Sequence, residues 1–157
     1  MSSEDIERLV QDRSLIREAF DDEQVAGYWI KAVTSLANAR TDGLSTDGAY
    51  LMAYTAALQA ALAVLTSHNL KVRGTSNHYM TFHALQKVSD ALRECGRRFD
   101  GLRLTRHQAV YEPEDDEDMP NLLERAMDTL RVGLFACREE IITVRPSLAG
   151  RLAPPGF

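Results

Sequence analysis

The sequence predicts an all-α protein, an antiparallel bundle of four to five helices. Apolar residues recur at intervals of three and four along most of the chain, whereas alternating β-branched runs bounded by turns are absent. Residues 49–65 are rich in Ala and apolar almost all round, which is typical of the central helix of a bundle. The short polar connections between the periodic segments favour neighbouring antiparallel helices.

Local signals set the expected ends of the helices. Asp21 and Asp22 open one helix, Ser45 to Asp47 provide an N-cap for the next, and Gly96 is expected to end another. Residues 68–77 are expected to form a polar loop. The expected helical ranges are 4–19, 22–40, 47–67, 78–95, 102–111 and 119–143.

The length of 157 residues fits one compact domain, which we place at residues 1–145. Residues 146–157 contain three of the five prolines and are expected to form an extended or disordered tail. The acidic N-terminus lacks the basic start and apolar stretch of a signal peptide, and no segment is expected to cross a membrane. Cys95 and Cys137 match no metal or disulfide spacing, so we expect reduced core cysteines and a cytoplasmic location.

Charge is unevenly distributed along the chain. The net charge is −5, which argues against diffuse binding of nucleic acid by the whole surface. Residues 69–107 nevertheless carry eight basic side chains against the three acids Asp90, Glu94 and Asp100. The basic residues are Lys71, Arg73, Lys87, Arg93, Arg97, Arg98, Arg103 and Arg106. This pattern indicates either a local anion site or a solvated helix face on which neighbours such as Glu94 pair with the arginines.

One ridge of the basic segment looks most like a site. Arg103, His107 and Tyr111 are spaced i, i+4 and i+8, and Arg106 lies beside them. Two guanidinium groups, an imidazole and a phenol can hold a phosphate and the base or sugar next to it. The acidic run 112–118 lacks the ligand spacing of a calcium loop, and we read it as the approach to a helix start or as a cover over the arginines.

Several other side chains have ordinary structural interpretations. Tyr111 could anchor its helix, His78 could belong to a helix cap, and His83 could be a packing residue. Tyr50 and Tyr54 lie one turn apart on the central helix and are expected in the core. Zinc-type His and Glu spacings, phosphate-binding Gly-rich loops and nucleophile elbows are absent from the sequence, so we expect no metal or cofactor.

Three segments resemble the HEPN (higher eukaryotes and prokaryotes nucleotide-binding) domain, over residues 22–143. Residues 28–40 resemble its first helix, with an aromatic and Ala-rich face. Residues 76–82 resemble the start of its third core helix, where a polar-His pair leads to Phe. Residues 106–111 resemble its Arg-polar-x-x-x-His motif, in the variant that ends in Tyr and an acid.

The resemblance implies a helical bundle that forms a homodimer with its Arg/His motifs facing across the two-fold axis. It also implies a metal-independent endoribonuclease of a toxin–antitoxin or phage-defence system, with Arg106, His107 and Tyr111 as catalytic residues. Arg103, Arg73, Asn77 and His78 would bind the RNA or nucleotide. The chain departs from the family at Tyr111, which stands where the family has its catalytic His. A free phenol has a pKa of about 10, so it is a poor base at neutral pH.

A second hypothesis from a different class is a non-catalytic module that neutralises or scaffolds a protein. Its partner would be a cognate antitoxin or a small nucleotidyltransferase. Contacts would come from the acidic run 112–118 and the C-terminal tail. The ridge from Arg103 to Tyr111 would then be a structural network.

Overall fold

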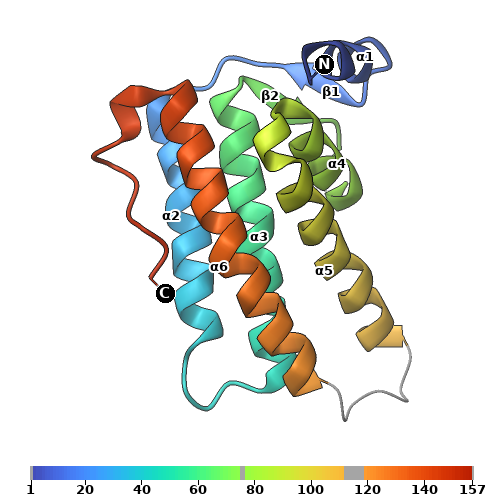
Figure 1. Ribbon diagram of the computed structural model, residues 1–157, viewed down its shortest axis with the longest axis vertical. Helices are drawn as coiled ribbons and strands as arrows, with labels where there is room; N and C mark the ends of the chain where they lie inside the picture. The colour runs from blue at the N-terminus through green and yellow to red at the C-terminus, as the bar shows by residue number, and fades with distance from the viewer. Residues whose placement is uncertain (1, 75–76, 112–118, 157) are drawn as a thin grey trace.

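The computed structural model describes residues 2–74, 77–111 and 119–156, with the backbone alone for Ser2 and for residues 107–111. The helices α2 (Asp22–Ala39), α3 (Thr46–Ser67), α5 (Arg93–Tyr111) and α6 (Met119–Val144) run alongside one another (Figure 1). Helix α4 (His78–Val88) packs against α5, and α1 (Ser2–Gln11) lies across the same end of the bundle. The described part of the chain is mostly helical, which confirms the all-α prediction.

A small sheet corrects the expectation that strands are absent. Strand β1 (Leu15–Arg17) pairs antiparallel with β2 (Leu70–Val72), so the helix expected over 4–19 ends early and the loop expected over 68–77 contains a strand. Leu15, Leu70 and Val72 are buried in a second small core with side chains of α1. A three-residue strand is too short to show the alternation of apolar and polar residues by which a strand is recognised in a sequence. These residues form strands because they are buried against residues far away in the chain.

The second correction concerns the break between α4 and α5. The sequence places it at Gly96, but the chain leaves α4 at Ser89, forms a 3₁₀ turn at Asp90–Leu92 and enters α5 at Arg93. Gly96 lies inside α5, where a Cβ would come within 2.9 Å of the Gln86 backbone nitrogen and 3.0 Å of the Phe82 carbonyl oxygen. The role of Gly96 is therefore to let α5 pack closely against α4. The short helix expected over 102–111 is the second half of α5.

The caps of the long helices follow the sequence more closely. Asp21 accepts a hydrogen bond from the Gln24 backbone N–H, while the Gln24 side chain accepts one from the Asp21 backbone, which forms a capping box at the start of α2. Ser45 accepts a hydrogen bond from the Gly48 backbone N–H at the start of α3, as its N-cap position predicts.

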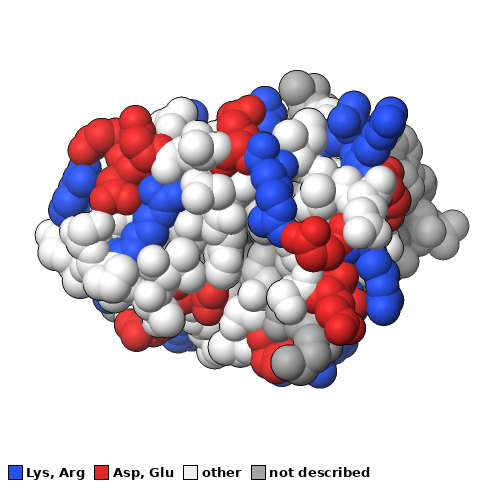
Figure 2. Space-filling model, turned by 90° about the horizontal axis from the view of Figure 1, so that it is seen from above, with Lys and Arg blue, Asp and Glu red and all other residues white. Residues whose placement is uncertain are grey.

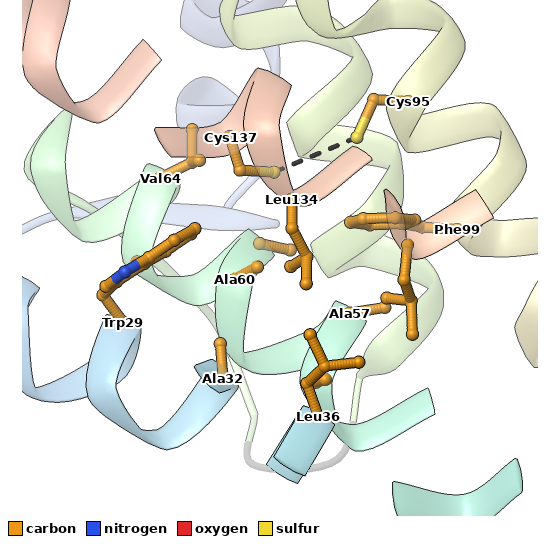
Figure 3. Packing of buried hydrophobic residues seen from close by; sticks show 14 of the residues in the cluster. Trp29, Ala32, Leu36, Ala57, Ala60, Val64, Cys95, Phe99, Leu134 and Cys137 are labelled. Carbon is orange, nitrogen blue, oxygen red and sulfur yellow. Dashed lines mark hydrogen bonds between the residues drawn. The ribbon is translucent and has the colours of Figure 1, made fainter. Parts of the chain in front are cut away.

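The central helix α3 is buried between α2 and α6. Its alanines Ala57 and Ala60 are fully buried, and their small side chains let Trp29 and Leu134 approach from the two neighbouring helices (Figure 3). By length and composition α3 could cross a membrane, but 61% of its apolar window lies inside the protein. This burial agrees with the predicted role of α3 as the centre of the bundle.

The two cysteines lie together in this core. The Sγ atoms of Cys95 on α5 and Cys137 on α6 are 3.9 Å apart, and both side chains are buried (Figure 3). The hydrogen bond with Cys95 and the burial of the pair raise the pKa of the Cys137 thiol well above its usual value. Gly133 of α6 lets α5 pack closely here, because a Cβ at this position would lie 2.5 Å from the Phe99 ring and 3.3 Å from Cys95 Sγ.

The C-terminal segment, expected to be extended or disordered, packs on the bundle. After α6 it forms a 3₁₀ turn at Pro146–Leu148 and returns along α2 (Figure 1). Leu148 and Leu152 are buried, and the Trp29 indole N–H donates to the Ala153 carbonyl oxygen at 2.7 Å. The tail is held because it covers the indole edge and supplies the acceptor that a buried Trp needs.

Candidate anion-binding site

The sequence-predicted binding residues gather around the start of α4. His78 is the first residue of α4, Asn77 is its N-cap, and Arg73 follows β2 directly. Arg103 and Arg106 lie on α5, close enough that both positive charges lower the pKa of His78. His78 therefore lies near both predicted groups of residues, Arg73 with Asn77 and Arg103 with Arg106. The side chains of His107 and Tyr111 lie outside the described residues.

Tyr54 on α3 links His78 to Arg106. The Tyr54 hydroxyl lies 2.8 Å from His78 Nδ1, and the Arg106 guanidinium carbon lies 5.3 Å from the centre of the Tyr54 ring. Burial raises the pKa of Tyr54 to about 12, so the phenol stays protonated at neutral pH. A buried hydroxyl proton needs an acceptor, and among the described residues His78 Nδ1 is the hydrogen-bond partner of Tyr54.

The hydrogen bond from Tyr54 sets the protonation of His78. Burial lowers the pKa of the imidazole, and the charges of Arg106 and Arg103 lower it further. His78 is thus neutral at pH 7, and since Nδ1 accepts from Tyr54, the proton resides on Nε2. This tautomer follows from the hydrogen-bond partners. Nε2 then offers an N–H donor to a ligand, and it cannot accept a proton as a general base would.

Arg103 and Arg106 differ in their partners. Arg103 donates to the Asp100 carboxylate at 2.7 Å, and its guanidinium carbon lies 5.5 Å from the centre of the Tyr79 ring. Arg106 is half-buried and, within residues 2–74, 77–106 and 119–156, forms no ion pair with a carboxylate. Among the described side chains, the charge of Arg106 is therefore the less compensated of the two. The predicted fold-back of the acidic run onto these arginines lies outside the described residues.

Tyr79 is an exposed aromatic side chain beside Arg103. It is 50% exposed, and its ring stacks on His83 with centroids 5.7 Å apart and planes 13° apart. His83 is half-buried, in line with its predicted packing role. The sequence missed Tyr79 as a site residue, since a Tyr in the first turn of a helix has no distinctive spacing.

Three arginines of the basic segment form an ion-paired face at the start of α5. Arg93 pairs with Asp90 at 2.9 Å, and Arg97 and Arg98 both pair with Glu94. These hydrogen bonds lower the pKa of Glu94 to about 2. Seen from above, basic and acidic side chains are interspersed on the surface (Figure 2). The solvated-face interpretation is therefore confirmed for these three arginines, which are strongly exposed.

A pocket of about 450 Å³ opens beside His78, between α2, α3, the sheet and the start of α4. Its apolar wall includes Leu58, Leu62 and Leu65 of α3 and Tyr28 of α2. Its polar lining contains several charged or hydrogen-bonding side chains: Glu18, Lys71, Arg73, Asn77, His78 and Thr81. The predicted residues Arg73, Asn77 and His78 thus share one concave surface.

The tyrosine partners show what the sequence could not reveal. Tyr50 and Tyr54 are buried as predicted, at 3% and 2% exposure. Their hydroxyl contacts, from Tyr50 to the Leu102 carbonyl and between Tyr54 and His78, were not anticipated. The available signal was chemical: a phenol on an otherwise Ala-rich buried helix needs a polar partner on a neighbouring element.

The part of the chain with described side chains holds no group of three or more His, Cys, Asp or Glu residues placed to bind a metal ion. Comparisons of the chain with protein-family models, curated proteins and solved structures find no match. The resemblance to the HEPN domain therefore depends on the sequence segments quoted above.

Proposed function

We propose that this protein binds phosphate groups of RNA or of a nucleotide through Arg106 and His78, on a HEPN-like helical bundle. The observation that carries this proposal is the Arg106–Tyr54–His78 arrangement. It sets a guanidinium without a carboxylate partner among the described side chains beside a neutral imidazole whose Nε2–H is a donor. Arg103, held by Asp100, adds a second cation at the edge of the site.

The same arrangement favours binding over cleavage at His78. A general base must accept a proton from the ribose 2′-OH, but Nδ1 of His78 is occupied by Tyr54 and Nε2 is protonated. An endoribonuclease activity would consequently depend on His107 with Arg106 and Tyr111. We propose that any such activity is metal-independent and belongs to a toxin–antitoxin or phage-defence system, with the protein acting as a homodimer.

Binding is tested with a fluorescent single-stranded RNA in EDTA, by anisotropy over a range of salt concentrations. We expect Arg106→Ala to weaken binding and to reduce the slope of log K against log salt by about 0.7 for each phosphate that the variant no longer neutralises. Arg98→Ala is the matched control, since Arg98 lies on the same helix but pairs with Glu94. Equal affinity of the two variants would refute the proposed site.

Cleavage is tested in the same reaction by following the length of the RNA. Loss of products in both Arg106→Ala and His107→Ala, with binding kept in the latter, would assign the chemistry to His107. Binding without products from the unmodified protein would limit the function to RNA or nucleotide binding. Both variants are compared at equal folded fraction by circular dichroism.

A second candidate function is the non-catalytic partner-binding module, for an antitoxin or a nucleotidyltransferase. It is favoured by two apolar side chains on one face of α6, Val132 at 68% and Phe135 at 45% exposure. Co-purification of one defined partner, lost in Val132→Asp with Phe135→Asp but kept in Arg106→Ala, would support it. The reverse pattern would favour the RNA site.

A further inference from the structure

We propose that the pocket beside His78 binds a small amphipathic monocarboxylate, a molecule with one carboxylate and a compact apolar body. This proposal does not depend on RNA binding, because it concerns the pocket between α2, α3 and the sheet rather than the Arg106 side of His78. The pocket volume of about 450 Å³ lies within the range of small-molecule sites.

The apolar part of the ligand is specified by α3. Leu58 and Leu62, one turn apart, line the pocket and are only partly buried in the described structure, whereas the residues around them in α3 are largely buried. Tyr28 of α2 lines the same pocket. Covering partly exposed leucine surface with an apolar body is favourable by about 25 cal/mol for each Å² removed from water.

The charge of the ligand is specified by the polar lining. Lys71 and Arg73 contribute two positive charges and Glu18 one negative charge, while His78 is neutral at pH 7. The start of α4 adds the partial positive charge of a helix N-terminus at Asn77 and His78. The side chains that line the pocket therefore carry a net charge of about +1. One carboxylate neutralises this charge, whereas a dianionic phosphate would leave an excess negative charge.

Arg73 is positioned in advance for such a ligand. Its backbone N–H donates to the Ser14 carbonyl oxygen at 3.1 Å, and its side-chain Nε donates to the Arg13 carbonyl oxygen at 2.8 Å. These bonds fix the guanidinium at the pocket while its two terminal nitrogens can face a carboxylate. Holding the cation before binding lowers the entropy lost when the ligand is bound.

The wall opposite α3 is also held in place. Asn69 bridges the segment after β1, because its carbonyl accepts from the Glu18 N–H at 3.1 Å and its side-chain oxygen accepts from the Phe20 N–H at 2.9 Å. Glu18 and Phe20 both line the pocket. The cavity is thus built by hydrogen bonds of the folded chain and exists before a ligand arrives.

The probes are octanoate and 2-naphthoate, which carry the same charge on an aliphatic and an aromatic body. Binding is measured by isothermal titration calorimetry and by NMR chemical shifts on the full chain at pH 7.5. Octanol and 2-naphthol serve as uncharged controls, and inorganic phosphate tests the preference for a monoanion. We expect at least one carboxylate to bind about tenfold more tightly than its alcohol.

Two variants separate the roles of charge and shape. Arg73→Gln should weaken carboxylate binding by about tenfold and leave the alcohol unaffected. Leu62→Trp fills the pocket from α3 and should abolish binding of both, and Arg98→Gln is the control for the loss of one arginine. Each variant is first shown to be folded by its thermal transition.

The outcomes are decisive in either direction. Failure of both carboxylates to bind at millimolar concentration, or binding that survives both Arg73→Gln and Leu62→Trp, would overturn the proposal. Tighter binding of phosphate than of either carboxylate would overturn it too. Loss of RNA binding in Arg106→Ala with octanoate binding intact would show that the pocket and the phosphate site are separate functions.

Discussion

Two arginines that contact α3 show how the same side chain can have different roles. Arg145 follows α6 and donates to the carbonyl oxygens of Ser67 and Thr66, to the Asn69 side chain and to Asp22. Its side chain is 14% exposed. Arg106, by contrast, lies over the Tyr54 ring and forms no ion pair with a described carboxylate.

The difference lies in how many donors are already used. Arg145 satisfies the carbonyls at the end of α3 and also the start of α2, so its donors are committed to holding three parts of the chain together. Arg106 has no carboxylate partner among the described side chains, and its charge lies close enough to His78 to lower the pKa of that ring. The structural role of Arg145 and the binding role proposed for Arg106 are therefore distinguished by the partners of the two side chains and not by their sequence context.

The largest expected effect is the loss of stability when the structural arginine, Arg145, is replaced. Arg145→Ala should lower the free energy of unfolding by about 3 kcal/mol, because it removes the hydrogen bonds that this half-buried guanidinium donates to Asp22 and to the Ser67 and Thr66 carbonyls. Urea denaturation measures the change. Arg106→Ala should change it by less than about 1 kcal/mol. Similar decreases in the two variants would contradict the distinction.

A second prediction concerns the packing against α4 of α5, the helix that carries Arg103 and Arg106. Gly96→Ala should cost about 2 kcal/mol, because the new Cβ meets backbone atoms of Gln86 and Phe82. Gly101→Ala in the same helix meets nothing within 4 Å and should stabilise the protein by about 0.5 to 1 kcal/mol. Thermal unfolding of the pair gives the contrast. A destabilisation by Gly101→Ala as large as that by Gly96→Ala would argue against close packing as the cause.

A third prediction concerns the tautomer of His78. Tyr54→Phe removes the donor to Nδ1 and should cost about 1 kcal/mol of stability. It should also shift the imidazole proton from Nε2 toward Nδ1, which long-range nitrogen-15 NMR of the ring detects. Tyr50→Phe, which affects the Leu102 carbonyl instead, is the control. An unchanged His78 spectrum in Tyr54→Phe would refute the assignment.

The smallest expected effect is a pH dependence from the same residue. The folded-state pKa of His78 lies below its unfolded value of about 6.5, since burial and two arginines disfavour the charged ring. The unfolded chain then binds more protons between the two pKa values, so stability rises with pH there. His78 contributes fully above pH 6.5 and loses its contribution as pH falls through the folded pKa. Denaturation between pH 5.5 and 7.5 should show a weaker rise in His78→Asn.

The candidate site was predictable in its residue types and only partly in its arrangement. The spacing of Arg103 and Arg106, and the position of His78 at a helix start, were read correctly from the chain. Their meeting point was not, because it depends on Tyr54 of α3 lying between α4 and α5. The pairing of Arg103 with Asp100 was also missed, although an i, i+3 spacing on a helix permits it.

The sequence by itself determined the helical class, the capping of α2 and α3 and the buried character of α3, since these depend on periodicity and on hydrogen bonds between near neighbours. Tertiary structure alone decided the short sheet, the role of Gly96, the packed C-terminal segment and the contrast between Arg145 and Arg106. Each of these depends on atoms far apart in the chain. Their burial and hydrogen-bond partners exist only once the helices have packed.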